Sequence, residues 1–262
     1  ICIIILKKNM FNRIGIIMAG GKGTRLHPLT KVVNKHLLPV YDKPMIHYPL
    51  STLIKLGHKK IYFISTKESI PLFKKLFGNG KKFGVKLIYK IQKKSNGIAA
   101  CFKILTKEIK NKKTTLILGD NIFFSDIKKI KKKIKKRGCT LILTQIKKPK
   151  QYGVAEVKKG KVIRLVEKPK KPKSNFVATG LYFFDENALK YFKKIEPSQR
   201  DEYEITDINN EYIKKNNCFF LKLSRQDQWF DLGKVQSLNE CSSFLQKKRG
   251  KKFDEYFKLS KY

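Results

Sequence analysis

A glycine-rich segment directly after an apolar stretch constrains the fold more than any other feature of the chain. Arg13–Met18 reads RIGIIM, which is typical of a buried β-strand, and Gly20-Gly21-Lys22-Gly23-Thr24-Arg25 follows at once. Glycines at these spacings let backbone N–H groups approach a phosphate closely and form an anion cradle. The segment is neither a Walker A motif nor a GxGxxG fingerprint, so by itself it is also compatible with an ordinary tight turn.

Strand and helix patterns alternate through the rest of the first half. The expected strands are Lys60–Ser65, Lys86–Gln92, Thr115–Leu118 and Thr140–Thr144. The expected helices are Met45–Leu56, a segment running towards Gly78, Ile98–Ile109, and a helix capped by Ser125 that carries Ile127, Ile130 and Ile134 on one face and ends at Gly138. This alternation predicts an α/β fold with a mostly parallel sheet and helices on both faces.

The pattern changes from Lys147 onwards. Gly153–Val157 and Lys161–Val166 predict a hairpin, and the remaining elements are a strand at Thr179–Phe184, a helix at Ile205–Lys215, a strand at Phe219–Leu223 and a helix at Val235–Lys247. Because there is no low-complexity linker, we expect the second half to pack on the first as a substrate lobe within one domain.

The chain is strongly basic, with 60 Lys and Arg against 20 Asp and Glu and a formal net charge of +40. A nucleic-acid-binding protein is one interpretation of this charge. The lysines are spread over every segment, however, and the chain is also rich in Ile, Asn, Phe and Tyr, as A/T-rich codons would produce. We therefore expect no specific nucleic-acid partner, although so basic a chain will attract polyanions weakly.

The cysteines and the hydropathy of the chain indicate the cellular compartment in which it works. The cysteines are Cys2, Cys101, Cys139, Cys218 and Cys241. Their odd number and the absence of a CxxC pair argue against a disulfide framework or a zinc site and suit a reducing cytoplasm. No segment is long and apolar enough to cross a membrane. Met10 is a candidate start, with residues 1–9 as an upstream extension.

The glycine-rich segment belongs to a longer motif. Residues 15–57 read GIIMAGGKGTRLHPLTKVVNKHLLPVYDKPMIHYPLSTLIKLG. This run resembles the sugar nucleotidylyltransferase family, with its G-G-x-G-T-R-L and K-x-L-L-P-V-x-D-K-P-M signatures, and HPLT and YPLST are most similar to glucose-1-phosphate thymidylyltransferases. LGDNIF, YGV, EKPKKPKSN, TGLYFFD, EITDIN and WFDLG follow in the family's order, so the resemblance covers about residues 13–250.

The resemblance implies both fold and activity. It implies a Rossmann-like nucleotidyltransferase domain over residues 13–250, with a nucleotide-binding half at 13–146, a sugar-binding half at 147–234 and a shortened C-terminal helical segment at 235–262. The implied reaction is a Mg²⁺-dependent transfer of a thymidylyl group from dTTP to α-D-glucose 1-phosphate, giving dTDP-glucose and pyrophosphate, the first step of dTDP-rhamnose synthesis. A cytoplasmic homo-oligomer is implied as well.

The resemblance also assigns site residues, and their chemistry suits phosphoryl transfer, which needs alignment and charge neutralisation. The catalytic residues are Arg25 and Lys35. The nucleotide-binding residues are Gly20, Gly21, Gly23, Thr24, Arg25, Lys35, Gln92, Gly97 and Asp120. The sugar-binding residues are Gly153, Glu167, Lys168 and Ala178. Two hard carboxylate ligands, Asp120 and Asp231, would hold Mg²⁺ together with substrate phosphates.

The chain departs from the family pattern at several positions. His36 stands for the usual Gln, Lys93 and Ser95 for Pro, Ala100 for Gln, Ala178 for Val and Leu232 for Thr. After Gly250 the sequence continues for fewer residues than the family does, which predicts weaker subunit association. Two alternatives remain: the same chemistry with UTP, since uracil differs from thymine only by a methyl group, and a decayed homologue that binds nucleotide without turnover.

Overall fold

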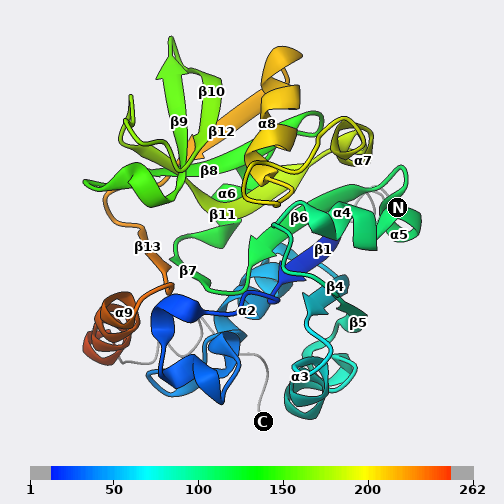
Figure 1. The fold of residues 1–262 in the computed structure, drawn as a ribbon, viewed down its shortest axis with the longest axis vertical. Helices are drawn as coiled ribbons and strands as arrows, with labels where there is room; N and C mark the ends of the chain where they lie inside the picture. Colours follow the sequence, from blue (N-terminus) through cyan, green and yellow to red (C-terminus); the bar gives the residue numbers. More distant parts are fainter. Residues whose placement is uncertain (1–12, 249–262) are drawn as a thin grey trace, which may run out of the picture.

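The computed structural model describes residues 13–248, and Figure 1 shows them as one central sheet with helices packed against it. Strand β1 (Arg13–Met18) lies between β4 (Lys60–Ser65) and β6 (Lys113–Leu118), and β5 (Lys86–Ile91) pairs with β4. All three pairings are parallel. These strands confirm the predicted mostly parallel central sheet, and their carboxyl ends meet at the edge that carries the glycine-rich loop.

The second half of the chain extends the same sheet. Strand β11 (Phe176–Phe184) runs antiparallel to β6 and also pairs with β8 (Cys139–Gln145) and β9 (Gly153–Lys158). The predicted hairpin is β9 with β10 (Lys161–Glu167). Strand β12 (Cys218–Lys222) lies parallel to β8. Because β11 joins both halves through one sheet, the two expected halves share a continuous framework, and the residue at which they divide stays a prediction.

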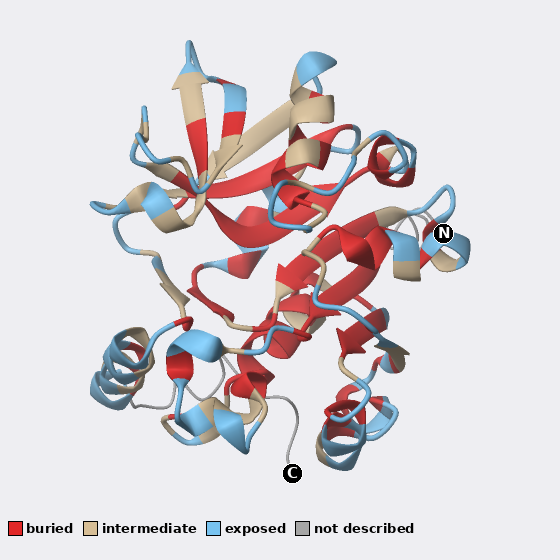
Figure 2. Cartoon of the chain, in the orientation of Figure 1, coloured by how far each residue is buried: buried red, intermediate tan, exposed pale blue. Residues whose placement is uncertain are grey.

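Helices cover both faces of this sheet, which is why its strands read as continuous apolar runs. Along β1 the side chains of Ile14, Ile16 and Met18 enter one core, whereas Ile17 enters the other. The first core packs on α4 (Ala100–Ile104), α5 (Thr106–Ile109), α7 (Ala188–Phe192) and α8 (Ile205–Lys214). The second packs on α2 (His47–Leu56), α3 (Ile70–Phe77) and α6 (Ile127–Lys133). In Figure 2 the buried residues concentrate on the sheet, and the outer helix faces are exposed.

Short elements complete the fold around the site. The 3₁₀ turns are η1 (Thr24–Leu26), η2 (Leu29–Lys31), η3 (Lys35–Leu37), η4 (Lys81–Phe83) and η5 (Pro149–Gln151). Two small antiparallel pairs are β2 (Pro39–Val40) with β3 (Lys43–Pro44), and β7 (Asn121–Phe124) with β13 (Gln228–Asp231). Helix α9 (Val235–Lys247) packs through Cys241 and Leu245 on a third core.

The structure corrects two of the predicted helices. Helix α6 is capped by Asp126 and not by Ser125, because the Asp126 carboxylate accepts hydrogen bonds from the N–H groups of the first turn at 3.0 and 3.2 Å. It also ends at Lys133, so Ile134 is extended and Gly138 does not terminate it. The single helix expected over Ile98–Ile109 is two short helices, α4 and α5, divided at Leu105.

Two further predictions concern the whole chain. Within residues 13–248 there is no helix that meets the length and hydropathy needed to span a bilayer. The expected upstream extension at residues 1–9 lies outside the described residues, as does the part of the C-terminal segment after residue 248.

Candidate active site

The glycine-rich loop leaves the carboxyl end of β1 and turns into η1. Gly23 has φ of +68°, and a Cβ there would lie 2.9 Å from the Cβ of Lys35, so glycine allows the loop to pack directly on the Lys35 segment. The Thr30 hydroxyl donates to the Gly23 carbonyl at 2.7 Å and fixes this turn. Gly20 is buried. The outer side of the loop faces solvent, because four of its residues are exposed: Gly21, Lys22, Thr24 and Arg25.

Lys35 and Asp120 form an ion pair beneath this loop. The exposed fractions of their side chains are 8% and 17%. Turn η3 holds Lys35 in place, because the Asn34 side chain accepts from the His36 N–H at 2.9 Å. Burial alone raises the pKa of Asp120, but the charge of Lys35 and the hydrogen bonds from Lys35 and Asn121 outweigh it and hold this pKa below its usual range. The Asp120 carboxylate is therefore ionised at neutral pH.

Asp231 comes to the same place from the far end of the chain. Strand β13 pairs with β7 so that Asp231 lies opposite Asn121, and the N–H of Leu232 donates to the Asp120 carbonyl at 2.9 Å. Burial and then the charge of Asp120 raise the pKa of Asp231 to about 6, against the opposing charges of Lys35 and Arg25. The two carboxylates predicted as metal ligands thus lie close enough to repel each other.

The chemistry of this pair fits a hard divalent cation. Mg²⁺ favours one or two protein carboxylates, with substrate phosphates and water supplying the remaining oxygens. Among residues 13–248 there is no group of three or more His, Cys, Asp or Glu side chains arranged to hold a metal ion. Asp120 and Asp231 would therefore supply two oxygen ligands to a magnesium ion, with substrate phosphates and water as candidates for the others.

The predicted base-binding residues meet behind the glycine-rich loop. Gln92 is buried, and its Oε1 lies 2.3 Å from where a Cβ of Gly20 would stand, so a larger residue at this position would displace the Gln92 amide. Its Nε2 donates to the Gly97 carbonyl at 3.5 Å, and Ser95 Oγ donates to the Gly20 carbonyl at 3.2 Å. Gly97 has φ of +97° and packs on the backbone of Tyr203. The structure thus brings Gln92 and Gly97 together beside the loop.

Three of the four predicted sugar-binding residues, Gly153, Glu167 and Lys168, lie at the open end of the β9–β10 hairpin. Glu167 pairs with Gly153, and Lys168 Nζ lies 3.9 Å from Glu167 Oε1. Glu167 and Lys168 border a cleft of about 460 Å³ whose other lining residues include Arg200, Glu204 and Thr206. Burial and then the charge of Glu204 raise the pKa of Glu167 to about 7, although Lys168 and Arg200 lower it. Ala178 lies buried in β11.

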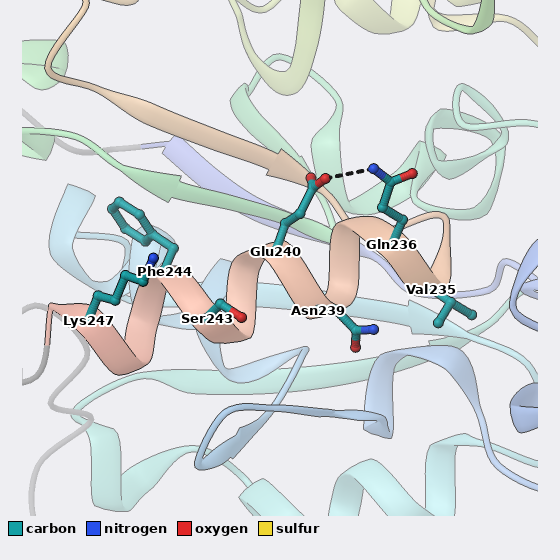
Figure 3. A pocket seen from close by; sticks show the side chains of 7 residues that line it. All are labelled: Val235, Gln236, Asn239, Glu240, Ser243, Phe244 and Lys247. Atoms are coloured by element: carbon teal, nitrogen blue, oxygen red, sulfur yellow. Dashed lines mark hydrogen bonds between the residues drawn. The ribbon is translucent and has the colours of Figure 1, made fainter.

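A separate hollow of about 700 Å³ runs along one face of α9 (Figure 3). Figure 3 shows its lining side chains on this single helix, with the Gln236 amide donating to Glu240 at 2.8 Å. Its lining residues are Val235, Gln236, Asn239, Glu240, Ser243, Phe244 and Lys247. None of them is a predicted site residue, so this hollow is separate from the candidate active site although it is larger than the cleft at Glu167.

Residues 14–248 match the family model described as Nucleotidyl transferase. The chain belongs to this family. It is 42% identical over 236 residues to a glucose-1-phosphate thymidylyltransferase from Neisseria meningitidis, a match that covers 88% of this chain and 82% of the relative. It is 43% identical over 242 residues to the enzyme of that name from Xanthomonas campestris, covering 90% of this chain and 82% of the relative.

Solved structures agree with this assignment. A Bacillus anthracis crystal structure, provisionally assigned as a glucose-1-phosphate thymidylyltransferase and solved with sucrose, superposes with a TM-score of 0.82 at 38% identity over 92% of this chain and 98% of that chain. A UDP-glucose pyrophosphorylase bound to UDP-glucose superposes with a TM-score of 0.80 over 91% of this chain and 100% of its own. At 22% identity, this second likeness shows the fold alone. The protein is a nucleotidyltransferase with the expected α/β fold.

Several residues of this nucleotidyltransferase site were missed by the sequence analysis. Asn121 Nδ2 donates to Asp120 Oδ1 at 2.8 Å, and Trp229 Nε1 donates to Asn121 Oδ1 at 2.7 Å. Asn121 follows Asp120 directly in LGDNIF, and Trp229 lies two residues before Asp231 in WFDLG, so proximity to the predicted carboxylates was the available signal. Arg200 Nη2 lies 2.7 Å from Glu204 and 3.7 Å from Glu167. No motif marked Arg200, because a loop brings it to the cleft.

The positions that depart from the family pattern lie mostly in the interior. Ala100 is buried in α4, and Leu232 is buried in the third core together with Leu26 and Leu38. His36 is buried against Gly119, and burial followed by the charge of Lys35 lowers its pKa to about 3, so its imidazole is neutral. These substitutions change packing around the site and leave the ion pair and the second carboxylate in place.

Proposed function

We propose that this nucleotidyltransferase is a Mg²⁺-dependent glucose-1-phosphate thymidylyltransferase, acting at the first step of dTDP-rhamnose synthesis. The observation that carries the proposal is the convergence of the glycine-rich loop, the Lys35–Asp120 ion pair and Asp231 at one edge of the sheet. The names of relatives that are 42–43% identical over most of the chain support the choice of substrates.

In the proposed reaction, a phosphate oxygen of glucose 1-phosphate attacks the α-phosphorus of dTTP, and the bond from this phosphorus to the bridging oxygen breaks to release pyrophosphate. The loop N–H groups and Arg25 would bind the phosphates that leave. Lys35, already buried beside the carboxylates, would balance charge at the α-phosphate. Asp120 and Asp231 would hold Mg²⁺, which supplies further neutralisation of phosphate charge when it is bound.

The sugar side would position the attacking phosphate. Glu167 would accept hydrogen bonds from glucose hydroxyls, while Lys168 and the nearby Arg200 supply positive charge to the sugar phosphate. Gly153 lies close to Thr206 and Glu167, since a Cβ there would stand 3.0 Å from Thr206 Cγ2 and 3.4 Å from Glu167 Oε2. In these roles the protein aligns the substrates and neutralises charge, which is what phosphoryl transfer mainly needs from an enzyme.

The base is the less constrained part of the proposal. Gln92 presents an amide with one donor and one acceptor side, which could read either thymine or uracil. A catalytically decayed homologue is disfavoured, because the departures that suggested it, Ala100 and Leu232, lie in the core and outside the phosphate site. Because nucleoside triphosphates and sugar phosphates are cytoplasmic metabolites, the proposed reaction places the enzyme in the cytoplasm.

A turnover assay with a nucleotide panel tests this function. Purified protein is supplied with glucose 1-phosphate, Mg²⁺ and either dTTP or UTP, and nucleotide sugar and pyrophosphate are measured together. We expect both products with dTTP, at a kcat/KM above that with UTP. A higher kcat/KM with UTP would reassign the base, and no product with either nucleotide from a folded protein would refute the proposed activity.

A further inference from the structure

The guanidinium of Arg25 lies against the second half of the chain. Its Nη1 donates to Gln151 Oε1 at 3.4 Å, across 126 residues of sequence. Gly233 also lies close to this guanidinium, since a Cβ there would stand 2.5 Å from Arg25 Nη2 and 3.0 Å from Cζ. Gly233 has no positive φ, so its backbone conformation does not require glycine. A larger residue at position 233 would instead prevent Arg25 from approaching so closely.

The Gln151 amide is itself oriented. Its Nε2 donates to the Tyr152 hydroxyl at 3.0 Å, so its Oε1 remains turned towards Arg25. The Tyr152 ring packs edge-on against Trp229 with 5.5 Å between ring centroids. Trp229 in turn donates to Asn121, which donates to Asp120. A chain of contacts thus ties the acceptor of Arg25 to the carboxylate end of the site.

Arg25 also lies near the second carboxylate. The Cβ position at Gly233 that is blocked by Arg25 is 3.4 Å from Asp231 Oδ1. A long, exposed arginine loses considerable side-chain entropy when it is fixed. A neutral amide can hold it in the free enzyme and still release it to a phosphate, because the ionic hydrogen bonds to phosphate are stronger.

We propose that Gln151 and Gly233 form a seat for Arg25, which sets its guanidinium beside Asp231 before the triphosphate binds. Both are positioning residues that act through Arg25. The inference rests on the proposed role of Arg25 on the leaving phosphates, and it adds two residues of the second half of the chain to the control of that role.

Double-mutant cycles test the seat, because they show whether one residue acts through another. The variants are Gln151→Ala, Gly233→Ala and Arg25→Ala, with each of the first two also placed in the Arg25→Ala background. We expect kcat/KM for dTTP to fall about 3–10-fold in Gln151→Ala, as for one charge-assisted hydrogen bond. We expect a fall of at least about 10-fold in Gly233→Ala, because a Cβ 2.5 Å from Arg25 Nη2 would push the guanidinium aside by about an ångström.

In the Arg25→Ala background, either substitution should change kcat/KM less than about 2-fold. Gln151→Glu should raise the KM for dTTP, because a carboxylate would compete with the phosphates for Arg25. Gln246→Ala, an exposed amide on α9, is the matched control and should be neutral in both backgrounds. Thermal unfolding of each variant confirms folding, and if Gly233→Ala unfolds, Gln151→Ala and Gln151→Glu decide.

The outcomes separate the two ideas. Near-normal turnover in a folded Arg25→Ala variant would remove the proposed role of Arg25 and the seat with it. An impaired Arg25→Ala variant combined with unchanged kinetics in Gln151→Ala would refute the seat and leave the proposed function standing. Equal losses from Gln151→Ala with and without Arg25 would also refute it, since Gln151 would then act on the substrate or on the fold.

Discussion

Glu167 links a proposed sugar contact to the pH dependence of stability. Its side chain is 22% exposed, and burial followed by the charge of Glu204 raises its pKa from an ordinary 4.5 to about 7. The folded protein therefore binds this proton more tightly than the unfolded chain does. The resulting stabilisation is complete below about pH 4.5 and is lost as the pH rises through about 7.

The magnitude follows from the size of the shift. A rise from 4.5 to about 7, at about 1.4 kcal/mol for each unit, corresponds to about 3 kcal/mol that ionised Glu167 costs the folded state at high pH. Glu167→Gln keeps the shape and removes the charge. We compare the free energy of unfolding of this variant with that of the native protein. The difference, variant minus native, should increase by roughly 2 kcal/mol as the pH rises from about 5 to about 8.

Urea unfolding at a series of pH values measures this difference, provided that the slopes with urea agree between the proteins. Glu196→Gln is the control, because Glu196 is exposed and its charge stays in solvent. A stability difference between Glu167→Gln and the native protein that stays constant across this pH range would refute the reasoning. It would show that the contacts of Glu167 with Lys168 and Arg200 cancel the cost of its burial.

Three further predictions concern the loop, the metal and the base side. Arg25→Ala should lower kcat at least about 100-fold, the scale for removing one electrostatic donor, while circular dichroism shows an intact fold. Asp120→Asn or Asp231→Asn should remove most Mg²⁺-dependent turnover, since a neutral amide is a weaker ligand for a hard cation. EDTA should abolish turnover by the native enzyme, and turnover that persists in EDTA would contradict the metal assignment. Gly97→Ala should destabilise the protein by about 1–3 kcal/mol, because its φ is +97° and its Cβ would lie 2.4 Å from the Tyr203 carbonyl oxygen; an unchanged urea midpoint would contradict this.

The sequence by itself determined the fold class and predicted most residues of the candidate site. Apolar runs such as Arg13–Met18 predict strands buried on both faces, because a parallel sheet covered by helices on both sides requires them. The motifs around Gly20–Arg25, Asp120 and Asp231 also identified the family. Local signals failed where two of them competed: Ser125 and Asp126 are both able to cap a helix, and only the backbone geometry selected Asp126.

Only the tertiary structure decided which side chains meet. Arg25 touches Gln151 and Gly233, and Glu167 meets Arg200, across long stretches of sequence. The protonation of the carboxylates is decided in the same way, since Lys35 holds Asp120 ionised while burial and Asp120 together raise the pKa of Asp231. Burial and charge act through space, so residues that are distant in sequence set these properties, and no local pattern of amino acids encodes them.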